Sequence, residues 1–337
     1  MPKIFMLLMA TPSLSGLGQS RRFHAPMMPD DDLELQLCFV RRHAAGYVAG
    51  VLGPDSVTWR INREAVLFLG AGRALLLQLA HPWVATAVAD HSQVFSDPIG
   101  RLHRTFRVMF TMIFGTLDQA LKGARQLRRR HAAITGVMPR AAGPFAAGSR
   151  YWANETSAQR WVHATLVETA LVAHDLILAP LSSADRERYY AESCILAALF
   201  GIPQASLPLN WEEFTAYNRA MWGSETLTVT PEARALAEQV LRGAKVWLRA
   251  PKWYGAVTAG MLPLRLRRAF RLPYGEAEQR IAEAAIARIR RIYPALPERL
   301  RYVGPYHEAV ARLSGRTRPS LLTQWANQIW IGRASIE

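Results

Sequence analysis

REAVLFLGAGRALLLQLAHPWVATAVADHSQVFSDPIGRLHRTFRVMFTMIFGT, residues 63–116, is the stretch that decides the fold of this chain. Most of its side chains are apolar, which is typical of helices inside a large core. It nevertheless contains three histidines and five arginines, namely His81, His91, His103, Arg63, Arg73, Arg101, Arg104 and Arg107. Burying a cation or an imidazole is costly unless the group has a partner. The stretch therefore predicts core helices that present these groups to a specific partner.

The apolar pattern predicts a buried helix over residues 63–80. It should stop near His81, because Pro82 disfavours helical geometry in the residue before it. A second helix is expected over residues 83–91 and a third over residues 99–114. Further helices are expected over residues 117–131, 156–178, 182–199, 211–221, 230–248, 276–293 and 305–313.

No alternation of period two is long enough to predict a sheet, and residues 136–150 are expected to form a loop. The sequence thus predicts an all-α fold in a single multi-helix domain. We expect residues 1–30 to be a disordered extension and residues 31–337 to form the helical domain. No window holds 18 uncharged apolar residues, so no membrane-spanning helix is predicted and a cytoplasmic location is expected.

The composition restricts the kinds of partner. The chain has 337 residues and a net charge of +15, and most of its cations are arginines. Arginine favours fixed, bidentate contacts with carboxylates or phosphates. Nucleic acid, anionic lipid and an acidic cofactor are the counter-charges that fit this balance. The two cysteines, Cys38 and Cys194, match no zinc or iron–sulfur spacing, so we expect two buried free thiols.

Arg101, Arg104 and Thr105 are spaced so that they share one face of a helix. Two guanidinium groups and a hydroxyl on one face form a clamp for carboxylates or phosphates. The alternative is a solvated helix face. The strongly apolar turns that follow, residues 108–113, count against that alternative.

His163 lies in an apolar helical run, W-V-H-A-T. Two interpretations fit it. One is a core histidine bonded to a carbonyl, which is the commoner situation. The other is an axial ligand to a haem iron, which needs a neutral imidazole on a rigid element with an acceptor for the second ring nitrogen. His81 and His91 are out of helical phase and do not have the spacing of a two-histidine metal site.

Residues 249–274 interleave aromatic residues, prolines and arginines. This mixture is typical of a segment at the surface of an anionic membrane, and peripheral membrane contact is therefore expected there. The alternative is an ordinary basic surface, with arginine stems lying along apolar side chains. No base-reading motif for nucleic acid occurs, so no nucleic-acid partner is expected.

A set of short motifs occurs in a fixed order along the chain. They are R-E-x-x-L-x-L-G-x-G-R-A-L-L-L-Q-L-A-H-P (63–82), A-D-H-S (89–92), D-P-x-G-R-L-x-R-T (97–105), H-A-x-I-x-G (131–136), Y-W-A-N-E (151–155), W-V-H-A-T (161–165), Y-Y-A-E (189–192), G-I-P (201–203) and L-P-E-R-L-R-Y (296–302). Together they resemble the MpaB-type oxygenase family, which is related to the latex-clearing rubber oxygenases. The resemblance covers residues 55–310 and is specific for the family but not for a substrate.

The resemblance implies an all-helical fold with a globin-like core and a b-type haem. It places the iron ligand at His163 and puts Arg101, Arg104 and Thr105 beside the haem. Latex-clearing proteins carry an arginine–x–x–lysine–threonine pattern there, and Arg104 replaces the lysine. A guanidinium will not ligate iron, so a distal site closed by lysine is not expected. Arg104 and Thr105 become the candidate catalytic residues.

Other candidates on the cofactor side also fall within the family motifs, but no role can be assigned to each: Thr165, Arg73, His81 and His91. The function that the resemblance implies is a haem b-dependent oxygenase. Its substrate would be apolar and isoprenoid- or lipid-like, with dioxygen bound on the side of the haem opposite His163. Buried arginines would be natural partners of the haem propionates.

Three other functions remain open on the sequence. A non-catalytic haem-binding sensor or carrier would need the same pocket. A non-haem, diiron-like helical enzyme is disfavoured, because no helix carries Glu-x-x-His. A basic module that binds membranes or nucleic acid would show a salt-dependent affinity. Composition and motifs do not determine the oligomeric state.

Overall fold

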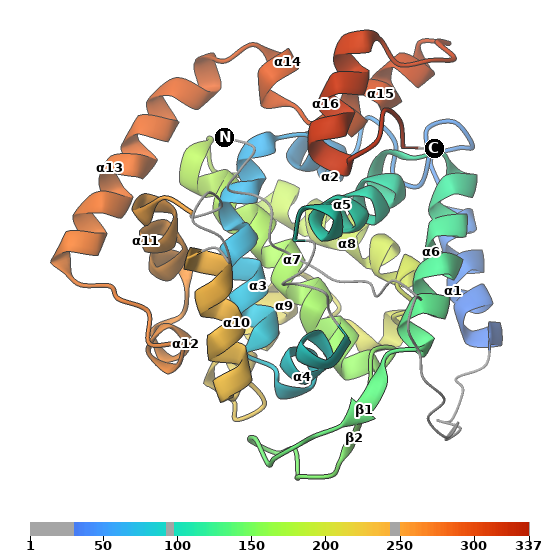
Figure 1. Cartoon of the computed structure of the whole chain (residues 1–337). Helices are drawn as coiled ribbons and strands as arrows, with labels where there is room; N and C mark the ends of the chain where they lie inside the picture. Colours follow the sequence, from blue (N-terminus) through green and yellow to red (C-terminus); the bar gives the residue numbers. More distant parts are fainter. Residues whose placement is uncertain (1–29, 92–97, 243–249, 337) are drawn as a thin grey trace.

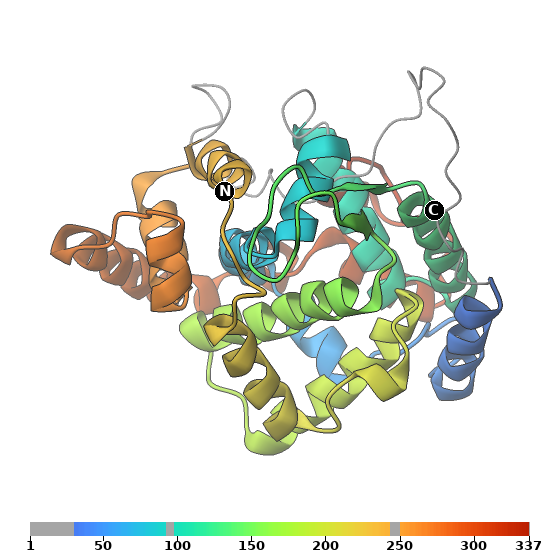
Figure 2. The same cartoon turned by 90° about the horizontal axis from the view of Figure 1, so that it is seen from below.

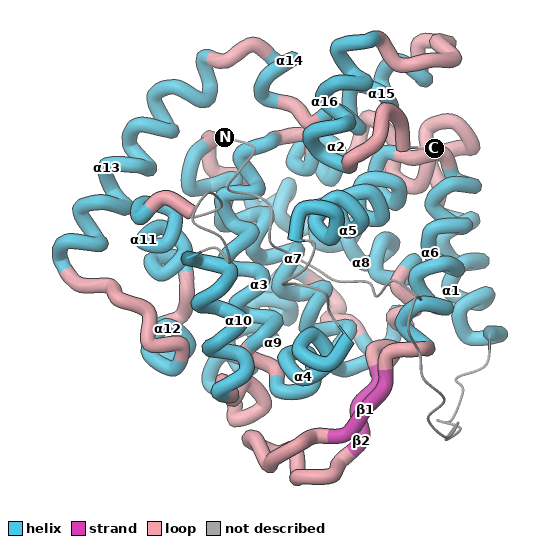
Figure 3. The backbone as a smooth tube through the Cα atoms, in the orientation of Figure 1, coloured by secondary structure: helices cyan, strands magenta, loops and turns pink. Residues whose placement is uncertain are grey.

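The computed structural model describes residues 30–91, 98–242 and 250–336 (Figure 1). Within these ranges the regular structure is helical, apart from one short two-stranded sheet (Figure 3). The all-α class predicted from the sequence is confirmed. The globin-like core stays a prediction. Of the extension predicted for residues 1–30, residues 1–29 lie outside the described residues.

The α-helices follow one another as α1 (Asp30–His43), α2 (Val57–Asn62), α3 (Ala71–Leu79), α4 (Pro82–His91), α5 (Pro98–Phe114), α6 (Leu117–Ala132), α7 (Thr156–Ile177), α8 (Ser183–Leu199), α9 (Trp211–Gly223), α10 (Pro231–Arg242), α11 (Lys252–Met261), α12 (Leu264–Ala269), α13 (Glu276–Ile292), α14 (Glu298–Arg301), α15 (Gly304–Leu313) and α16 (Leu321–Ile331). The described ranges also contain three short 3₁₀-helices: η2 (Ala65–Gly70), η3 (Gln204–Ser206) and η5 (Tyr293–Ala295). The strands β1 (Thr135–Val137) and β2 (Arg150–Trp152) pair antiparallel, with Gly136 opposite Tyr151.

The long helix α7 lies at the centre of the fold (Figures 1 and 2). It begins after Glu155, whose carboxylate accepts a hydrogen bond from the backbone N–H of Ala158 and so caps the first turn. It packs against η2, α2, α3, α8 and α13, and buried side chains occur around most of its circumference. A helix that is covered on so many sides is an interior element. It can therefore hold a polar group such as His163 away from water.

The single helix predicted over residues 63–80 is wrong, because the structure divides this range into η2 and α3. Tyrosine hydroxyls from distant segments bond to its backbone. The N–H of Val66 donates to Oη of Tyr293 at 3.1 Å, and the N–H of Gly72 donates to Oη of Tyr254 at 2.9 Å. These outside partners make an unbroken α-helical ladder unnecessary.

Gly70 joins η2 to α3 at a close approach to α7. A Cβ atom on Gly70 would lie 2.5 Å from Cγ2 of Thr169, so only glycine fits there without a shift. The next break was predicted correctly, since α3 ends at Leu79 and α4 begins at Pro82. Within the described ranges no single helix is long and apolar enough to span a membrane; the segments 65–79 and 82–91 pass that test only as a pair bent by 103°.

One large apolar core runs from Leu33 in α1 to Ile336 near the end of the chain. A second, smaller cluster lies between η2, α11 and α13, where Tyr254 and Tyr293 are buried. Cys38 is exposed, which corrects the expectation that both thiols are buried. Cys38 reaches solvent because it lies on the outer side of α1.

Residues 249–274 form α11 and α12 within the part that is described, and their aromatic residues are buried or partly buried. Tyr254, Leu262 and Phe270 are buried in the core, and only Leu264 of the large apolar residues there is exposed. Peripheral membrane contact of this segment stays a prediction. The helix α16 was not predicted, although Ser320 caps its start and Gly332 ends it with φ of 67°.

Candidate functional site

A cavity of about 220 Å³ lies between α3, α4, α5, α6 and α7, with β2 at its edge. Most of its wall is made of leucine, valine, alanine and aromatic side chains. Its polar side chains are Gln78, His91, Arg104, Thr105, His131, Tyr151, Gln159 and His163, besides two tryptophans. Four of the predicted site residues, His91, Arg104, Thr105 and His163, are thus brought to one cavity.

His163 reaches the cavity from α7 and is only 7% exposed. Its Nε2 atom lies 3.0 Å from the carbonyl oxygen of Ser193. Because a carbonyl only accepts, Nε2 carries the hydrogen and Nδ1 keeps a lone pair. Burial lowers the pKa of His163 to about 4, so the imidazole is neutral at pH 7. A carbonyl bond alone also fits a core histidine; the position on the cavity wall is what favours a ligand.

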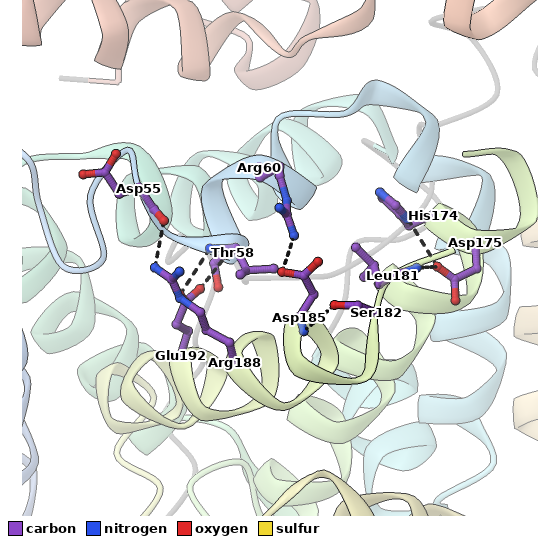
Figure 4. A network of polar contacts seen from close by, with 11 residues as sticks. Asp55, Thr58, Arg60, His174, Asp175, Leu181, Ser182, Asp185, Arg188 and Glu192 are labelled. Atoms are coloured by element: carbon purple, nitrogen blue, oxygen red, sulfur yellow. Dashed lines mark hydrogen bonds and ion pairs between the residues drawn. The ribbon is translucent and has the colours of Figure 1, made fainter. Parts of the chain in front are cut away.

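The carbonyl that holds His163 belongs to α8, and α8 is tied to α2 by a polar network (Figure 4). Glu192 precedes Ser193 and accepts hydrogen bonds from the backbone N–H groups of Val57 at 3.2 Å and Thr58 at 2.7 Å. An ion pair between Arg60 and Asp185 joins the same two helices. The hydrogen-bond acceptor of the histidine therefore sits on a helix that is fixed from the opposite side.

Arg104 and Thr105 reach the cavity from α5, and Val108 and Met109 of the next turn line it as well. Arg104 and Thr105 therefore share the face of α5 that their spacing predicted, and this face is turned to the cavity. Arg101 lies on the same helix, but its side chain is outside the described part of the structure. Of the three residues in the predicted clamp, the structure describes the side chains of Arg104 and Thr105.

Arginine side chains gather beside this face of α5. The pKa of Arg107 is lowered first by burial and then by the positive charges of three other arginines, Arg333, Arg130 and Arg104. These groups come from α5, α6 and the segment after α16, which packs on α5. These positive charges make an electropositive edge beside α5, of which Arg104 is the member that lines the cavity, and such an edge favours an anionic group of a ligand.

Two more imidazoles line the cavity. Nε2 of His91 donates to the carbonyl oxygen of Thr135 at 3.0 Å, since that oxygen only accepts. His131 ends α6, and within the described residues its buried Nδ1 atom has no hydrogen-bond partner. Burial, followed by the positive charges of Arg128 and Arg130, lowers the pKa of His131 to about 4. A buried polar atom without a protein partner is expected where a ligand binds.

His131 had no predicted role, but the sequence contains a signal for its position. The buried side chains of α6 include Ala120, Ala124 and Leu127, and His131 continues that stripe by one further turn. A histidine in register with an apolar stripe points inward. The neighbouring arginines, which make the end of this helix strongly basic, conceal that register.

Gln78 and Tyr151 are two further polar side chains at the cavity that sequence reasoning missed. Nε2 of Gln78 donates to Oγ1 of Thr165 at 3.0 Å, so Thr165 lies behind Gln78 and is not among the lining residues. The hydroxyl of Tyr151 donates to the carboxylate of Asp90 at 2.6 Å. Burial and this carboxylate raise the pKa of Tyr151, so the phenol stays protonated.

Arg73 is not among the residues that line the cavity. Its guanidinium donates to the carbonyl oxygen of Met261 at 3.0 Å, to Oγ1 of Thr169 at 2.6 Å and to the carboxylate of Glu168 at 2.7 Å. These bonds join α3, α7 and the end of α11. The structure thus shows a buried cation with protein partners, and its contact with a cofactor stays a prediction.

His81 also lies outside the cavity lining. Its ring centroid is 5.1 Å from that of Phe145 and 6.2 Å from that of Trp83. Burial lowers the pKa of His81 to about 4, and its Nδ1 atom has no hydrogen-bond partner among the described residues. Its assignment to the cofactor side stays a prediction.

The described residues include no cluster of three or more His, Cys, Asp or Glu side chains placed to hold a metal ion. A haem iron makes a different demand, because the porphyrin supplies the in-plane ligands and one histidine suffices from the protein. The cavity wall carries two buried, neutral imidazoles, His163 and His131, and the positive charges beside α5 reach it through Arg104.

Comparison with known proteins gives a family. A family model described as "ER-bound oxygenase mpaB/B'/Rubber oxygenase, catalytic domain" matches residues 58–291. Neither the curated proteins nor the solved structures contain a match to this chain. The matched range spans α2 to α13 and includes every helix that lines the cavity. This chain belongs to the family of mpaB and rubber oxygenase catalytic domains.

Proposed function

We propose that this protein is a haem b-dependent oxygenase that acts on an apolar, isoprenoid- or lipid-like substrate. One observation carries the proposal: the neutral imidazole of His163 lies on the wall of a mainly apolar cavity that Arg104 and Thr105 also line. The family supports the oxygenase class. The apolar wall supports the class of substrate, because a pocket of this kind favours a ligand without charges.

The residues present fit the chemistry of a haem. His163 has one ring nitrogen bonded to the Ser193 carbonyl and a lone pair on the other, which suits an axial ligand. The electropositive edge that Arg104 shares with Arg107 suits the two carboxylates of the cofactor. When bound, haem supplies the activation of dioxygen that an oxygenase needs.

The side chains of the cavity have separate tasks in this proposal. The leucines, valines and aromatic rings exclude water and hold the apolar substrate. Gln78 is fixed because its amide nitrogen donates to Thr165, which leaves its carbonyl oxygen as an acceptor that orients a polar atom. The Thr105 hydroxyl can donate or accept, and it is the side chain that can move a proton at this face.

Arg104 stands where latex-clearing proteins carry a lysine. A guanidinium is a permanent cation and has no lone pair for iron. In this protein the α5 face therefore contributes positive charge and hydrogen-bond donors, and it does not contribute a ligand.

The test is to express the chain with ample haem and iron and to record its absorption spectrum and metal content. We expect a Soret band in the parent protein. His163→Ala should lose the band or shift it in the ferrous form, since the axial nitrogen is removed. The matched control is His174→Ala, because His174 lies on the same helix, is similarly buried and does not line the cavity. It should keep the parent spectrum.

Two results would refute parts of the proposal. A purified protein that shows no Soret band under these conditions removes the haem. An unchanged ferrous spectrum in His163→Ala removes the ligand assignment. Oxygen consumption with isoprenoid and fatty-acyl compounds then tests the activity, and spectra that respond to ligands without turnover would favour a haem-binding sensor or carrier.

A further inference from the structure

The outer side of the last two helices carries large apolar side chains in solvent. On α16, Leu321 is 83% exposed, Trp325 is 62% exposed and Leu322 is 53% exposed. On α15, Val310 and Leu313 are also exposed. We call these five residues the hairpin face. Single exposed apolar residues are common on protein surfaces, but five that gather on one helix pair indicate an interaction site.

The pairing of α15 with α16 brings these residues together. The amide of Asn327 donates to the carboxylate of Glu308 at 2.6 Å, and both side chains are buried. The two helices run antiparallel from this bond to the loop that joins them, at the edge of the fold (Figure 1). The helices also approach each other closely at Gly304, where an added Cβ atom would lie 2.5 Å from Oδ1 of Asn327.

The inner side of the pair is fixed to the body of the protein. Nε2 of His103, on α5, donates to the carbonyl oxygen of Ile329 at 3.1 Å. The guanidinium of Arg312 donates to the carbonyl oxygens of Val48 at 3.1 Å and Phe114 at 2.6 Å. The hairpin face is therefore the outer surface of a rigid pair, and the exposed side chains are not free to turn inward.

The segment from the middle of α15 to the end of the described residues carries charges of one sign only. Residues 309–336 contain four arginines and no aspartate, glutamate or lysine. Arg316 and Arg318 lie in the loop between the helices and are exposed. Leucine and tryptophan flanked by arginine is the composition of segments that lie in a lipid interface. The positive charge is complementary to an anionic surface.

We propose that the hairpin face docks on a membrane surface that contains anionic lipid. Leu321, Leu322 and Trp325 enter the boundary between headgroups and acyl chains, and the loop arginines contact the lipid phosphates. A second copy of this chain fits less well, because a symmetric contact would bring Arg316 and Arg318 of both copies together. The proposal uses no part of the haem assignment.

The experiment is flotation of the whole protein with two kinds of vesicle: pure phosphatidylcholine, and phosphatidylcholine with about a third phosphatidylglycerol. The parent protein should bind the anionic vesicles more tightly. A triple variant, L321S/L322S/W325S, should lose about tenfold or more of that affinity, because its apolar anchors are gone. Arg316→Ser and Arg318→Ser should each lose about fivefold on the anionic vesicles.

The matched control is Leu209→Ser, because Leu209 is 85% exposed but lies between η3 and α9. It should bind vesicles as the parent does. Trp325→Leu keeps an apolar anchor and should still bind. In vesicles whose acyl chains are brominated, the tryptophan fluorescence of the parent should be quenched, and Trp325→Leu should lose that quenching. This result would place Trp325 itself in the lipid.

Three outcomes would overturn the proposal. The first is a triple variant that binds anionic vesicles as tightly as the parent while its circular dichroism is unchanged. The second is a dimer in sedimentation velocity that the triple variant abolishes, because the hairpin face would then be covered by a second copy. The third is a parent protein that binds neither kind of vesicle.

Discussion

The buried ion pair between Arg73 and Glu168 yields the sharpest prediction about stability. The side chain of Arg73 is 2% exposed and that of Glu168 is 14% exposed, and the two groups are 2.7 Å apart. Burial raises the pKa of Glu168, although the charge of Arg73 and its hydrogen bond act in the opposite direction. Desolvation is thus the largest effect on this carboxylate, so the pair is costly to bury.

The perturbation is Glu168→Ala. It leaves the Arg73 cation in the interior with two neutral acceptors, the Met261 carbonyl and the Thr169 hydroxyl. Removing one partner of a buried pair costs about 3–5 kcal/mol. Because the two neutral acceptors remain, we expect the lower end, about 3 kcal/mol. The double variant R73M/E168L removes both charges and should cost about 1 kcal/mol or less, since paired charges replaced by apolar side chains are often neutral.

Urea unfolding at pH 7, followed by circular dichroism, measures the cost of Glu168→Ala, and a matched cycle is made of the parent, R73M, E168L and R73M/E168L. The expected coupling free energy between the two residues is about 2 kcal/mol or more. Arg60 and Asp185 provide the control pair, because they are also 2.7 Å apart but considerably exposed, and their coupling should be below about 1 kcal/mol. If Glu168→Ala costs less than about 1 kcal/mol, the reasoning from desolvation fails.

Two further predictions concern pH and packing. Burial lowers the pKa of His81, His131 and His163 to about 4, below the ordinary value of 6.5, so the unfolded chain binds more protons and stability falls as pH decreases from about 6.5 to about 4. Each histidine contributes up to about 1.4 kcal/mol of unfolding free energy per pH unit. His131→Gln should reduce by that amount the slope of the unfolding free energy, measured in urea, against pH. An unchanged slope would contradict the lowered pKa of His131. Gly70→Ala should cost about 1–3 kcal/mol of stability, because its Cβ atom would lie 2.5 Å from a threonine methyl of α7. The control Gly255→Ala has nothing within 4 Å of its Cβ atom and should be neutral or stabilising. Equal urea midpoints for the two variants would refute the packing argument.

The parts of the fold that could be predicted depend on local rules. The break before Pro82 follows from the geometry of the proline ring, and the structure has it at that place. The split of residues 63–80 could not be predicted, because Tyr254 and Tyr293 arrive from far along the chain to bond its backbone. A long-range partner leaves no trace in the local pattern.

The same distinction explains the site. The shared face of Arg104 and Thr105 follows from helical spacing, whereas His163 was named as a candidate ligand through the family resemblance. Their meeting in one cavity depends on how α5 packs against its neighbours, and spacing does not determine that packing. Arg73 belongs to a family motif as much as His163 does, yet its guanidinium is bonded to Glu168 away from the cavity wall.

Burial alone does not mark a functional histidine in this protein. His81, His131 and His163 all have a pKa lowered to about 4, and desolvation is the largest cause in each. His81 packs against aromatic rings outside the cavity, which is the environment of a structural core residue. Of these three, His131 and His163 line the cavity, and of these two His163 is the one with a nitrogen bonded to a backbone carbonyl in the described structure. The proposal that His163 is the ligand therefore depends on geometry. A titration that found all three histidines neutral would not distinguish His163 from His81 as the ligand.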